Sequence, residues 1–267
     1  MQKYLVILYL VLFPLSAASQ FLLSRMVSSI SNLHVNDLVQ DDQGFMWIAT
    51  AKGLCRYDGV GYNVFYHLQR QPRSIGSDNV NALYFDGRDL WCATGDGVSM
   101  FDMNTWQFTN YRMKHHMGSY CLGFFFSGRH LYTYGYGGIY EVKKGSGRLV
   151  PVINFEGQVV QRAIVDSHGQ IWVVCDGNEV MCFDASMNLC RKIDFGTTKE
   201  VYSIYQAPGC NILLGTKNGL VALDKDTYTF LPAAVPPALM HMSVKYIKGY
   251  APGKVVIGTK DNELKFF

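Results

Sequence analysis

The chain repeats one pattern about every 40 residues, and this repetition constrains its fold more than any other feature. In each copy a bulky apolar anchor is followed six residues later by glycine or asparagine, which adopt a left-handed backbone most readily. The anchors are Trp47, Trp91, Tyr132, Trp172, Leu213 and Val256. The residues that follow them are Gly53, Gly97, Gly138, Asn178, Gly219 and Asn262. A period of this size with strand-like content indicates a solenoid or a propeller.

The first copy predicts four short strands within one period. Residues 36–40 alternate polar and apolar side chains, residues 45–50 form an apolar run, and residues 54–57 and 62–66 alternate again. Turn-forming residues separate these segments, and no segment sustains the 3.6-residue period of a helix. We therefore expect an all-β fold, a β-propeller of four-stranded antiparallel blades that start near residues 36, 79, 118, 160, 201 and 242. Trp47, Trp91 and Trp172 then pack between neighbouring blades.

The end of the repeat array bears on how the ring closes. The last copy reaches Phe267 at its third strand, and residues 21–23 precede the first blade without a place in it. Because an unpaired edge invites aggregation, residues 21–23 are expected to supply the missing outer strand of a closed six-bladed ring. The alternative is a seven-bladed ring of which this chain is an open part.

The first 19 residues resemble a signal peptide. Lys3 gives a positive start, residues 4–15 are apolar, and small residues precede Gln20. The alternative is an uncleaved anchor, which would be the chain's contact with a membrane, because no later segment is long and apolar enough to span one. In both cases the propeller, residues 20–267, is expected outside the cytoplasm.

Charge and cysteine content exclude other classes of protein. The net charge is +3 without any basic run, so no nucleic-acid partner is expected. None of the seven cysteines has the spacing of a metal site. Cys55, Cys92, Cys175 and Cys182 fall in predicted strands and should be buried as small apolar side chains. A disulfide between Cys182 and Cys190 stays open for an oxidising compartment.

Catalytic motifs are missing from the sequence. There is no nucleophile elbow, zinc-binding helix motif or phosphate loop, so we expect no catalytic residue, metal or cofactor. The pair His115–His116 falls in a loop and His168 falls in a turn. Aspartates recur at predicted turns, where their side chains accept backbone N–H bonds; these are Asp41, Asp42, Asp86, Asp166 and Asp224.

Residues 39–59, VQDDQGFMWIATAKGLCRYDG, resemble a two-component regulator propeller repeat. Weaker copies are residues 90–98, 169–172 and 214–220, and the resemblance covers residues 21–267. It implies the periplasmic sensor region of a hybrid two-component system of a gram-negative bacterium, a class that usually senses glycans or their breakdown products. No spacer domain, kinase, receiver or DNA-binding module is recognisable, so we do not expect this chain to phosphorylate or to bind promoters by itself.

The turns between the second and third strands are expected to gather at one mouth of the ring, together with the connections between blades. Aromatic rings stack on sugars and charged groups bind hydroxyls or uronates, so polar and aromatic residues there are ligand-binding candidates. The candidates are Lys52, Arg70, Arg73, Asp96, Tyr134, Tyr136, Asp176, Lys217 and Lys260.

The sequence thus predicts a ligand-binding sensor without catalysis of its own, which recognises an oligosaccharide or another small ligand. Binding at the mouth of the ring or at an interface between two rings would favour one arrangement of a homodimer, and membrane and kinase parts absent from this chain would report it. Two alternatives remain open. One is a propeller lyase of the streptogramin-inactivating type, with His115 or His168 as weak candidates, and the other is a protein-interaction scaffold.

Overall fold

A computed structural model describes residues 31–32, 34–113, 120–195, 200–206, 211–251, 254–261 and 263–267. Several predictions concern residues outside these ranges: the signal segment 1–19, the closing strand 21–23, His115 and His116, Cys210 and Asn262. They stay predictions.

The described residues are almost entirely β-structure, arranged as consecutive antiparallel strands. The first sheet contains β1 (Val35–Gln40), β2 (Met46–Thr50), β3 (Gly53–Tyr57) and β4 (Tyr62–Phe65). The second contains β5 (Val80–Phe85), β6 (Asp89–Thr94), β7 (Gly97–Asp102) and β8 (Gln107–Tyr111). Each has the four strands and three turns that the sequence predicts, because turn residues interrupt every apolar run.

The later repeats depart from that pattern. A six-stranded sheet contains β9 (Cys121–Ser127), β10 (His130–Lys143), β11 (Arg148–Val165), β12 (Ile171–Cys175), β13 (Glu179–Phe183) and β14 (Leu189–Asp194). A three-stranded sheet contains β15 (Val201–Gln206), β16 (Asn211–Thr216) and β17 (Gly219–Asp224). The last contains β18 (Val244–Ala251), β19 (Lys254–Thr259) and β20 (Leu264–Phe266). Two 3-10 turns, η1 (Pro232–Ala234) and η2 (Pro237–Leu239), lie between β17 and β18.

The prediction of six separate blades, closed or as part of a seven-bladed ring, is wrong: the described residues form five sheets. Strand β11 is the reason. Its first half pairs with β10, from Lys143 opposite Arg148 to Gly138 opposite Asn154. Its second half pairs with β12. Repeats three and four are therefore joined by one continuous strand, where the sequence predicts a break between blades.

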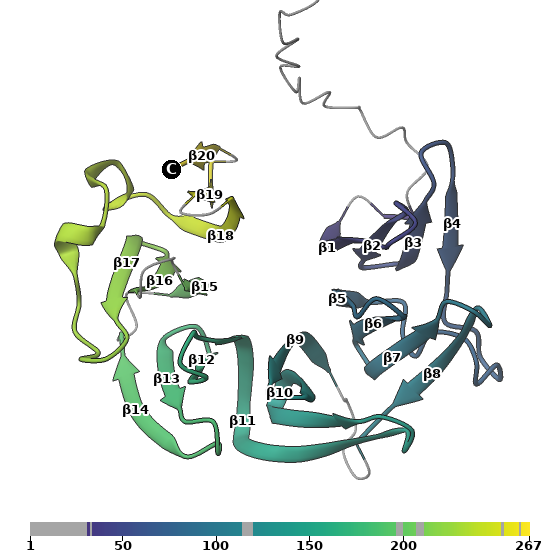
Figure 1. Cartoon of the computed structure of the whole chain (residues 1–267). Helices are drawn as coiled ribbons and strands as arrows, with labels where there is room; N and C mark the ends of the chain where they lie inside the picture. The colour runs from purple at the N-terminus through teal and green to yellow at the C-terminus, as the bar shows by residue number, and fades with distance from the viewer. Residues whose placement is uncertain are drawn as a thin grey trace, which may run out of the picture.

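The sheets follow one another around a common axis, and the inner strand of each repeat lies nearest that axis (Figure 1). Contacts join the inner strands of successive repeats, β1 with β5, β5 with β9, β9 with β11, β11 with β15 and β15 with β18. In the part of the chain that the structure describes, the ring is open between the β18–β20 sheet and the β1–β4 sheet (Figure 1). No helix in that part is long and apolar enough to cross a membrane.

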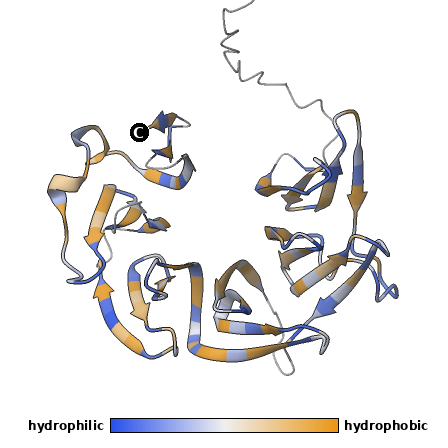
Figure 2. Cartoon of the chain, viewed as in Figure 1, coloured by the Kyte–Doolittle hydropathy of each residue, from blue (hydrophilic) through white to orange (hydrophobic). Residues whose placement is uncertain are grey.

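The predicted role of the tryptophans is confirmed. Trp47, Trp91 and Trp172 are fully buried, each on the second strand of its repeat. Each packs in a cluster with residues of the following repeat, as Trp47 does with Leu83 and Leu90. Hydrophobic positions recur in the strands of every sheet (Figure 2). Burying a large aromatic side chain stabilises the fold by about 2–3 kcal/mol, so these anchors hold neighbouring sheets together.

The cysteines follow the prediction in part. Cys55, Cys92, Cys175 and Cys182 are buried, as expected for small apolar side chains in strands. The six cysteines among the described residues are thiols, so the alternative of a disulfide between Cys182 and Cys190 is wrong in this structure. Burial raises the pKa of the Cys182 thiol to about 12, which keeps it protonated.

Candidate functional site

One hydrogen bond recurs in all six repeats and defines a face of the ring. The turn between the second and third strands donates a backbone N–H to the carbonyl just before the inner strand of the same repeat or, in repeat four, just before the half of β11 that pairs with β12. The pairs are Ala51 to His34, Gly95 to Asn79, Tyr136 to Tyr120, Asp176 to Val159, Lys217 to Glu200 and Lys260 to Ser243, at 2.8–3.3 Å. These turns and strand starts therefore lie together on what we call the turn face, although the sheets number five.

The turns are locally rigid because a threonine closes several of them. The hydroxyl of Thr50 donates to the Gly53 carbonyl at 2.8 Å and accepts the Lys52 amide at 3.0 Å. Thr94 and Thr216 make the same two bonds in their repeats. Gly53 has φ of 107°, which side chains other than glycine rarely adopt. A rigid turn holds an exposed side chain at its tip in a fixed place.

The structure divides the nine predicted ligand-binding residues among several places on and near the turn face. Lys52, Asp176, Lys217 and Lys260 are exposed in turns. Asp176 accepts the Val159 amide at 2.9 Å through Oδ1, so this carboxylate is partly used by the turn itself. The other five candidates lie in three separate places: Tyr134 in the core, Tyr136 at one cavity, and Arg70, Arg73 and Asp96 near another.

Tyr134 does not belong to the site. Its side chain is 7% exposed and packs in a core cluster with Phe125, Ile139 and Val160. Burial raises its pKa above the ordinary value for tyrosine. A ring buried in this core is not placed to stack on a sugar. Strict alternation would put Tyr134 and Tyr136 on one face of β10, but the register shifts between Tyr134 and Gly135, and Tyr136 stays 46% exposed.

Lys217 and Lys260 lie around a third lysine that the sequence did not single out. Lys245 Nζ lies 3.1 Å from the ring centroid of Tyr202, and the Tyr202 hydroxyl donates to Glu200 Oε2 at 2.7 Å. Burial lowers the pKa of Lys245, and the nearby positive charges of Lys260 and Lys217 lower it further, against the opposing effect of Glu200. Lys217 and Lys245 thus interact with the Glu200 carboxylate, and Lys260 adds a third positive charge at the β15–β18 boundary, which leaves this corner cationic.

Arg70, Arg73 and Asp96 lie near a rim cavity of about 430 Å³. The cavity is lined by His67, Leu68, Arg70, Gln71, Pro72, Asn110 and Arg112. Nε and Nη2 of Arg112 both donate to Asp96 Oδ2 at 2.8 Å, and Arg73 Nη1 donates to Gln107 Oε1 at 2.8 Å. Two of the predicted charges are therefore engaged within the protein, and Arg70, with φ of 65°, is the predicted residue that lines the cavity.

Tyr136 lines a cavity of about 320 Å³ on the turn face. The other lining residues are Met113, Gly137, Tyr140, Asn154, Glu156 and Gly157. Between Gly138 opposite Asn154 and Tyr136 opposite Val159 the register shifts, so β11 bulges here. The Tyr140 hydroxyl donates to the Tyr136 carbonyl at 3.0 Å, which fixes the backbone that carries the exposed ring. An aromatic ring, an amide and a carboxylate therefore converge on one hollow.

Sequence reasoning missed Asn154 and Glu156. They lie on the bulge where β11 passes from repeat three to repeat four. Gly157, with φ of 74°, was the available signal, because an isolated glycine inside a strand pattern suggests a bulge. Bulges often stand beside functional sites, since they redirect side chains out of the sheet.

His168 lies away from the turn face. It belongs to the turn before β12, whereas Asp176 follows the other end of that strand. Its Nε2 lies 3.4 Å from Nζ of Lys225, a lysine with a 2% exposed side chain that also pairs with Asp226. Among the described residues, no group of three or more histidine, cysteine or acidic side chains is placed to hold a metal ion.

The fold defines the chain as a β-propeller. Residues 29–52 match the family model of the two-component regulator propeller, which confirms over these residues the resemblance seen in the sequence. No curated protein sequence gives a significant match.

Solved structures share the architecture at low sequence identity. The extracellular domain of the putative hybrid two-component system BT3049 from B. thetaiotaomicron is 22% identical with a TM-score of 0.73, covering 89% of this chain and 34% of that one. This chain therefore spans about a third of that structure. YCF48 bound to D1 peptide is 13% identical with a TM-score of 0.66, covering 91% and 81%. Virginiamycin B lyase from Staphylococcus aureus is 12% identical with a TM-score of 0.62, covering 88% and 84%.

Proposed function

We propose that this chain is an extracytoplasmic sensor propeller of a two-component system and that it binds an oligosaccharide on its turn face. The repeat at residues 29–52 supports the sensor assignment, as does the likeness in fold to an extracellular domain of a putative hybrid system. The signal-like residues 1–19 support a location beyond the inner membrane, in the periplasm of a gram-negative bacterium.

The observation that carries the ligand class is the cavity beside Tyr136. Its ring is 46% exposed at a hollow of about 320 Å³, large enough for one sugar ring. Aromatic faces stack on the C–H face of a sugar, while the amide of Asn154 and the carboxylate of Glu156 bond its hydroxyls. The cationic corner around Lys245 would favour an acidic group elsewhere on the same oligosaccharide.

The position of the cavity supports a mechanism by population shift. Apart from Met113, its lining belongs to β10 and to the bulge of β11, the strand shared by repeats three and four. A sugar held there contacts the junction between two repeats, and it stabilises the arrangement of that junction to which it binds more tightly. That arrangement would favour one form of a homodimer, and kinase and DNA-binding parts outside these residues would report it.

The test measures binding of a panel of neutral and acidic oligosaccharides by calorimetry. We expect Tyr136→Ala to weaken the best ligand about 5- to 30-fold, because a stacked aromatic ring contributes about 1–2 kcal/mol. Tyr66→Ala is the matched control, since Tyr66 is also 46% exposed and lies outside the cavity. Equal affinity of the Tyr136 variant and the wild type, or no binding of any sugar, would refute the proposal.

The same samples test the lyase alternative. Its described histidine candidate, His168, lies at the end of β12 away from the turn face and is bonded within the protein. We expect the bound oligosaccharide to be recovered intact, and chemical turnover would contradict a pure sensor.

A further inference from the structure

In repeat five the fourth strand is replaced by residues 231–239, which we call the arch. In repeat two, β8 needs three residues to pass from Phe108, opposite Phe101, to Tyr111, opposite Val98. Repeat five starts in the same way, with Phe230 opposite Leu223. The chain then takes ten residues to reach Met240, whose carbonyl lies beside Gly219 as that of Tyr111 lies beside Gly97. The seven additional residues leave the sheet in the segment that contains η1 and η2.

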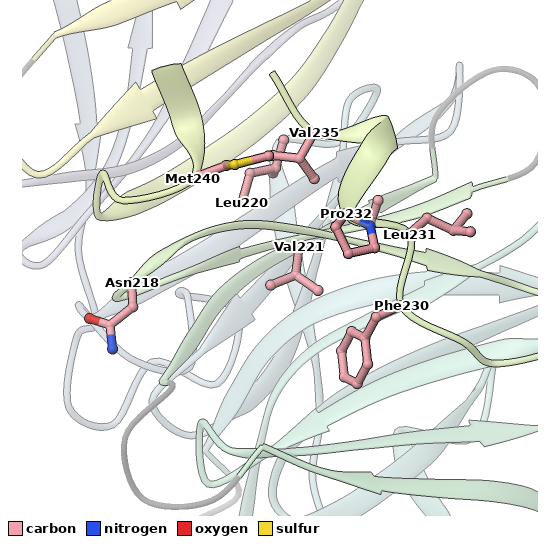
Figure 3. A pocket seen from close by; sticks show the side chains of 9 residues that line it. Asn218, Leu220, Val221, Phe230, Leu231, Pro232, Val235 and Met240 are labelled. Carbon is pink, nitrogen blue, oxygen red and sulfur yellow. The ribbon is translucent and has the colours of Figure 1, made fainter. Parts of the chain in front are cut away.

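A pocket of about 220 Å³ lies between β17 and this arch (Figure 3). Leu220 and Val221 come from the strand, and Leu231, Pro232 and Val235 come from the arch. The remaining lining residues are Asn218, Ala222, Phe230 and Met240. No charged side chain is among the lining residues. The pocket therefore offers an apolar environment with one amide at its edge.

The chain itself shows what fills the equivalent place in complete sheets. Val221 stands two residues after Gly219, as Cys55 does after Gly53 and Ser99 after Gly97. Val64 of β4 lies opposite Cys55. Asn110 of β8 lies opposite Ser99 and accepts its hydroxyl at 2.7 Å. In both sheets a residue of the fourth strand lies beside this position and has matching polarity. Val64 is apolar like Cys55, and Asn110 is polar like Ser99. The equivalent partner of Val221 would therefore be one apolar residue on an extended backbone.

The rim of the pocket supports contact with another molecule. Phe230 is 50% exposed and Met240 is 36% exposed, so two large apolar side chains stand at its edge in contact with solvent. The arch contains Pro232, Pro236 and Pro237, which have no backbone N–H and restrict its conformation. A stiff apolar pocket with an aromatic and a flexible thioether at its rim is suited to one anchoring side chain.

We propose that this pocket binds one aliphatic or aromatic side chain, presented by an extended segment of a partner polypeptide. The anchor takes the place beside Val221 that Val64 holds beside Cys55. Its peptide groups lie along the outer edge of β17 at Leu220, because the Ala222 carbonyl already accepts the Leu231 amide. This pocket shares no lining residue with the cavity beside Tyr136, and the proposed contact does not depend on the proposed oligosaccharide.

The experiment follows the methyl resonance of Met240 during titration with three probes. N-acetylphenylalaninamide carries an anchor and peptide groups, toluene carries the ring alone, and N-acetylglycinamide carries the peptide groups alone. We expect saturable binding of the first probe, at least tenfold weaker binding of toluene, and none of N-acetylglycinamide. Val221→Phe fills the floor of the pocket and should weaken the first probe at least tenfold.

Val60→Phe is the matched control, because Val60 is 96% exposed in a distant turn and the substitution is the same. It should bind the first probe like the wild type. Circular dichroism of both variants reports whether they fold, and the comparison of probes on the wild type is decisive if Val221→Phe does not. The proposal is overturned if N-acetylphenylalaninamide does not bind the wild type, if toluene binds equally well, or if a folded Val221→Phe protein binds unchanged. A concentration-dependent shift of Met240 without any probe would assign the pocket to a second copy of the chain instead, and would also overturn it.

Discussion

Asp41 and Trp47 are joined by a hydrogen bond from the indole Nε1 to the carboxylate Oδ2, at 2.8 Å. The other oxygen, Oδ1, accepts the amides of Gln43 and Phe45 at 3.0 Å. One carboxylate therefore shapes the turn and also holds the anchor that packs against the next sheet. The same arrangement joins Asp86 to Trp91 at 2.9 Å and Asp166 to Trp172 at 3.0 Å.

Replacing Asp41 should be costly for stability. Asp41→Ala leaves the indole N–H of the fully buried Trp47 without its partner and removes two turn bonds, so we expect a loss of about 3 kcal/mol. Urea unfolding measures the loss. Asp42→Ala alters the exposed neighbour and should change the free energy of unfolding by less than about 0.5 kcal/mol. Similar losses in both variants would contradict this account of the Asp41 bonds.

Two neighbouring carboxylates should show opposite dependence on pH. Burial raises the pKa of Asp86, but hydrogen bonds outweigh it and the pKa lies below the ordinary value. The donors are the Asp89 amide, the Trp91 indole, Lys144 and the Arg88 amide. Burial raises the pKa of Asp89, and the charge of Asp86 raises it further.

The signs follow from linkage between protonation and folding. Asp86 stabilises the fold above the unfolded carboxyl pKa of about 3.9, and this contribution disappears as the pH falls through the lower folded pKa. Ionisation of Asp89 instead destabilises the fold as the pH rises through its raised folded pKa. At pH 7 we expect Asp86→Asn to be less stable than the wild type and Asp89→Asn to be more stable. Both differences should shrink towards pH 3 in urea titrations, and differences that stay constant with pH would count against these assignments.

Gly97 should tolerate no side chain. Its φ is 90°, and a Cβ there would collide with the Tyr111 carbonyl across the sheet. Gly59 has a similar φ of 96° with nothing within 4 Å of the added atom. Gly59→Ala should cost about 1 kcal/mol from backbone strain alone, whereas Gly97→Ala should cost more than about 3 kcal/mol. Thermal unfolding of the two variants separates strain from collision, and equal losses would show that the carbonyl contact does not matter.

Cysteine labelling should distinguish Cys190 from Cys182. Cys190 is exposed, while Cys182 is buried with its thiol pKa raised to about 12. Because the thiolate is the reactive form, iodoacetamide at pH 8 should modify Cys190 in the native protein and leave Cys182 unmodified. Peptide mass spectrometry identifies the labelled residue. Both should react in urea, and rapid native labelling of Cys182 would mean that the β13–β14 hairpin opens.

The periodic features of the fold could be predicted from sequence because they are local. The strands of the first repeat, the burial of Trp47 and the turn role of Asp41 follow from turn residues and alternation within one period. The left-handed backbone is confirmed at Gly53, Gly97, Gly138 and Gly219. It is wrong for Asn178, because that turn places Asp176 and Gly177 at positive φ instead.

The non-local features could not be predicted. Whether β11 breaks or continues depends on its pairing with β10 and β12 at once, which no window of sequence contains. Tyr134 and Tyr136 look alike in sequence, and only the pairing of β10 with its neighbours shows which ring is buried. Asn154 and Glu156 meet Tyr136 through a register shift, so no motif marks them in advance.

The continuity of β11 also determines where the molecule can deform. Two sheets that touch only through side chains can tilt against each other, whereas backbone hydrogen bonds along both halves of one strand resist such a tilt. Repeats three and four should therefore move as a single stiff body. Bending of the ring is then left to the boundaries that no continuous strand crosses. At the one between β1 and β5, side-chain packing is supplemented by single hydrogen bonds from Asn36 to the Val80 carbonyl and from the Leu83 amide to Asp37. A load applied at the bulge is shared by one third of the repeats.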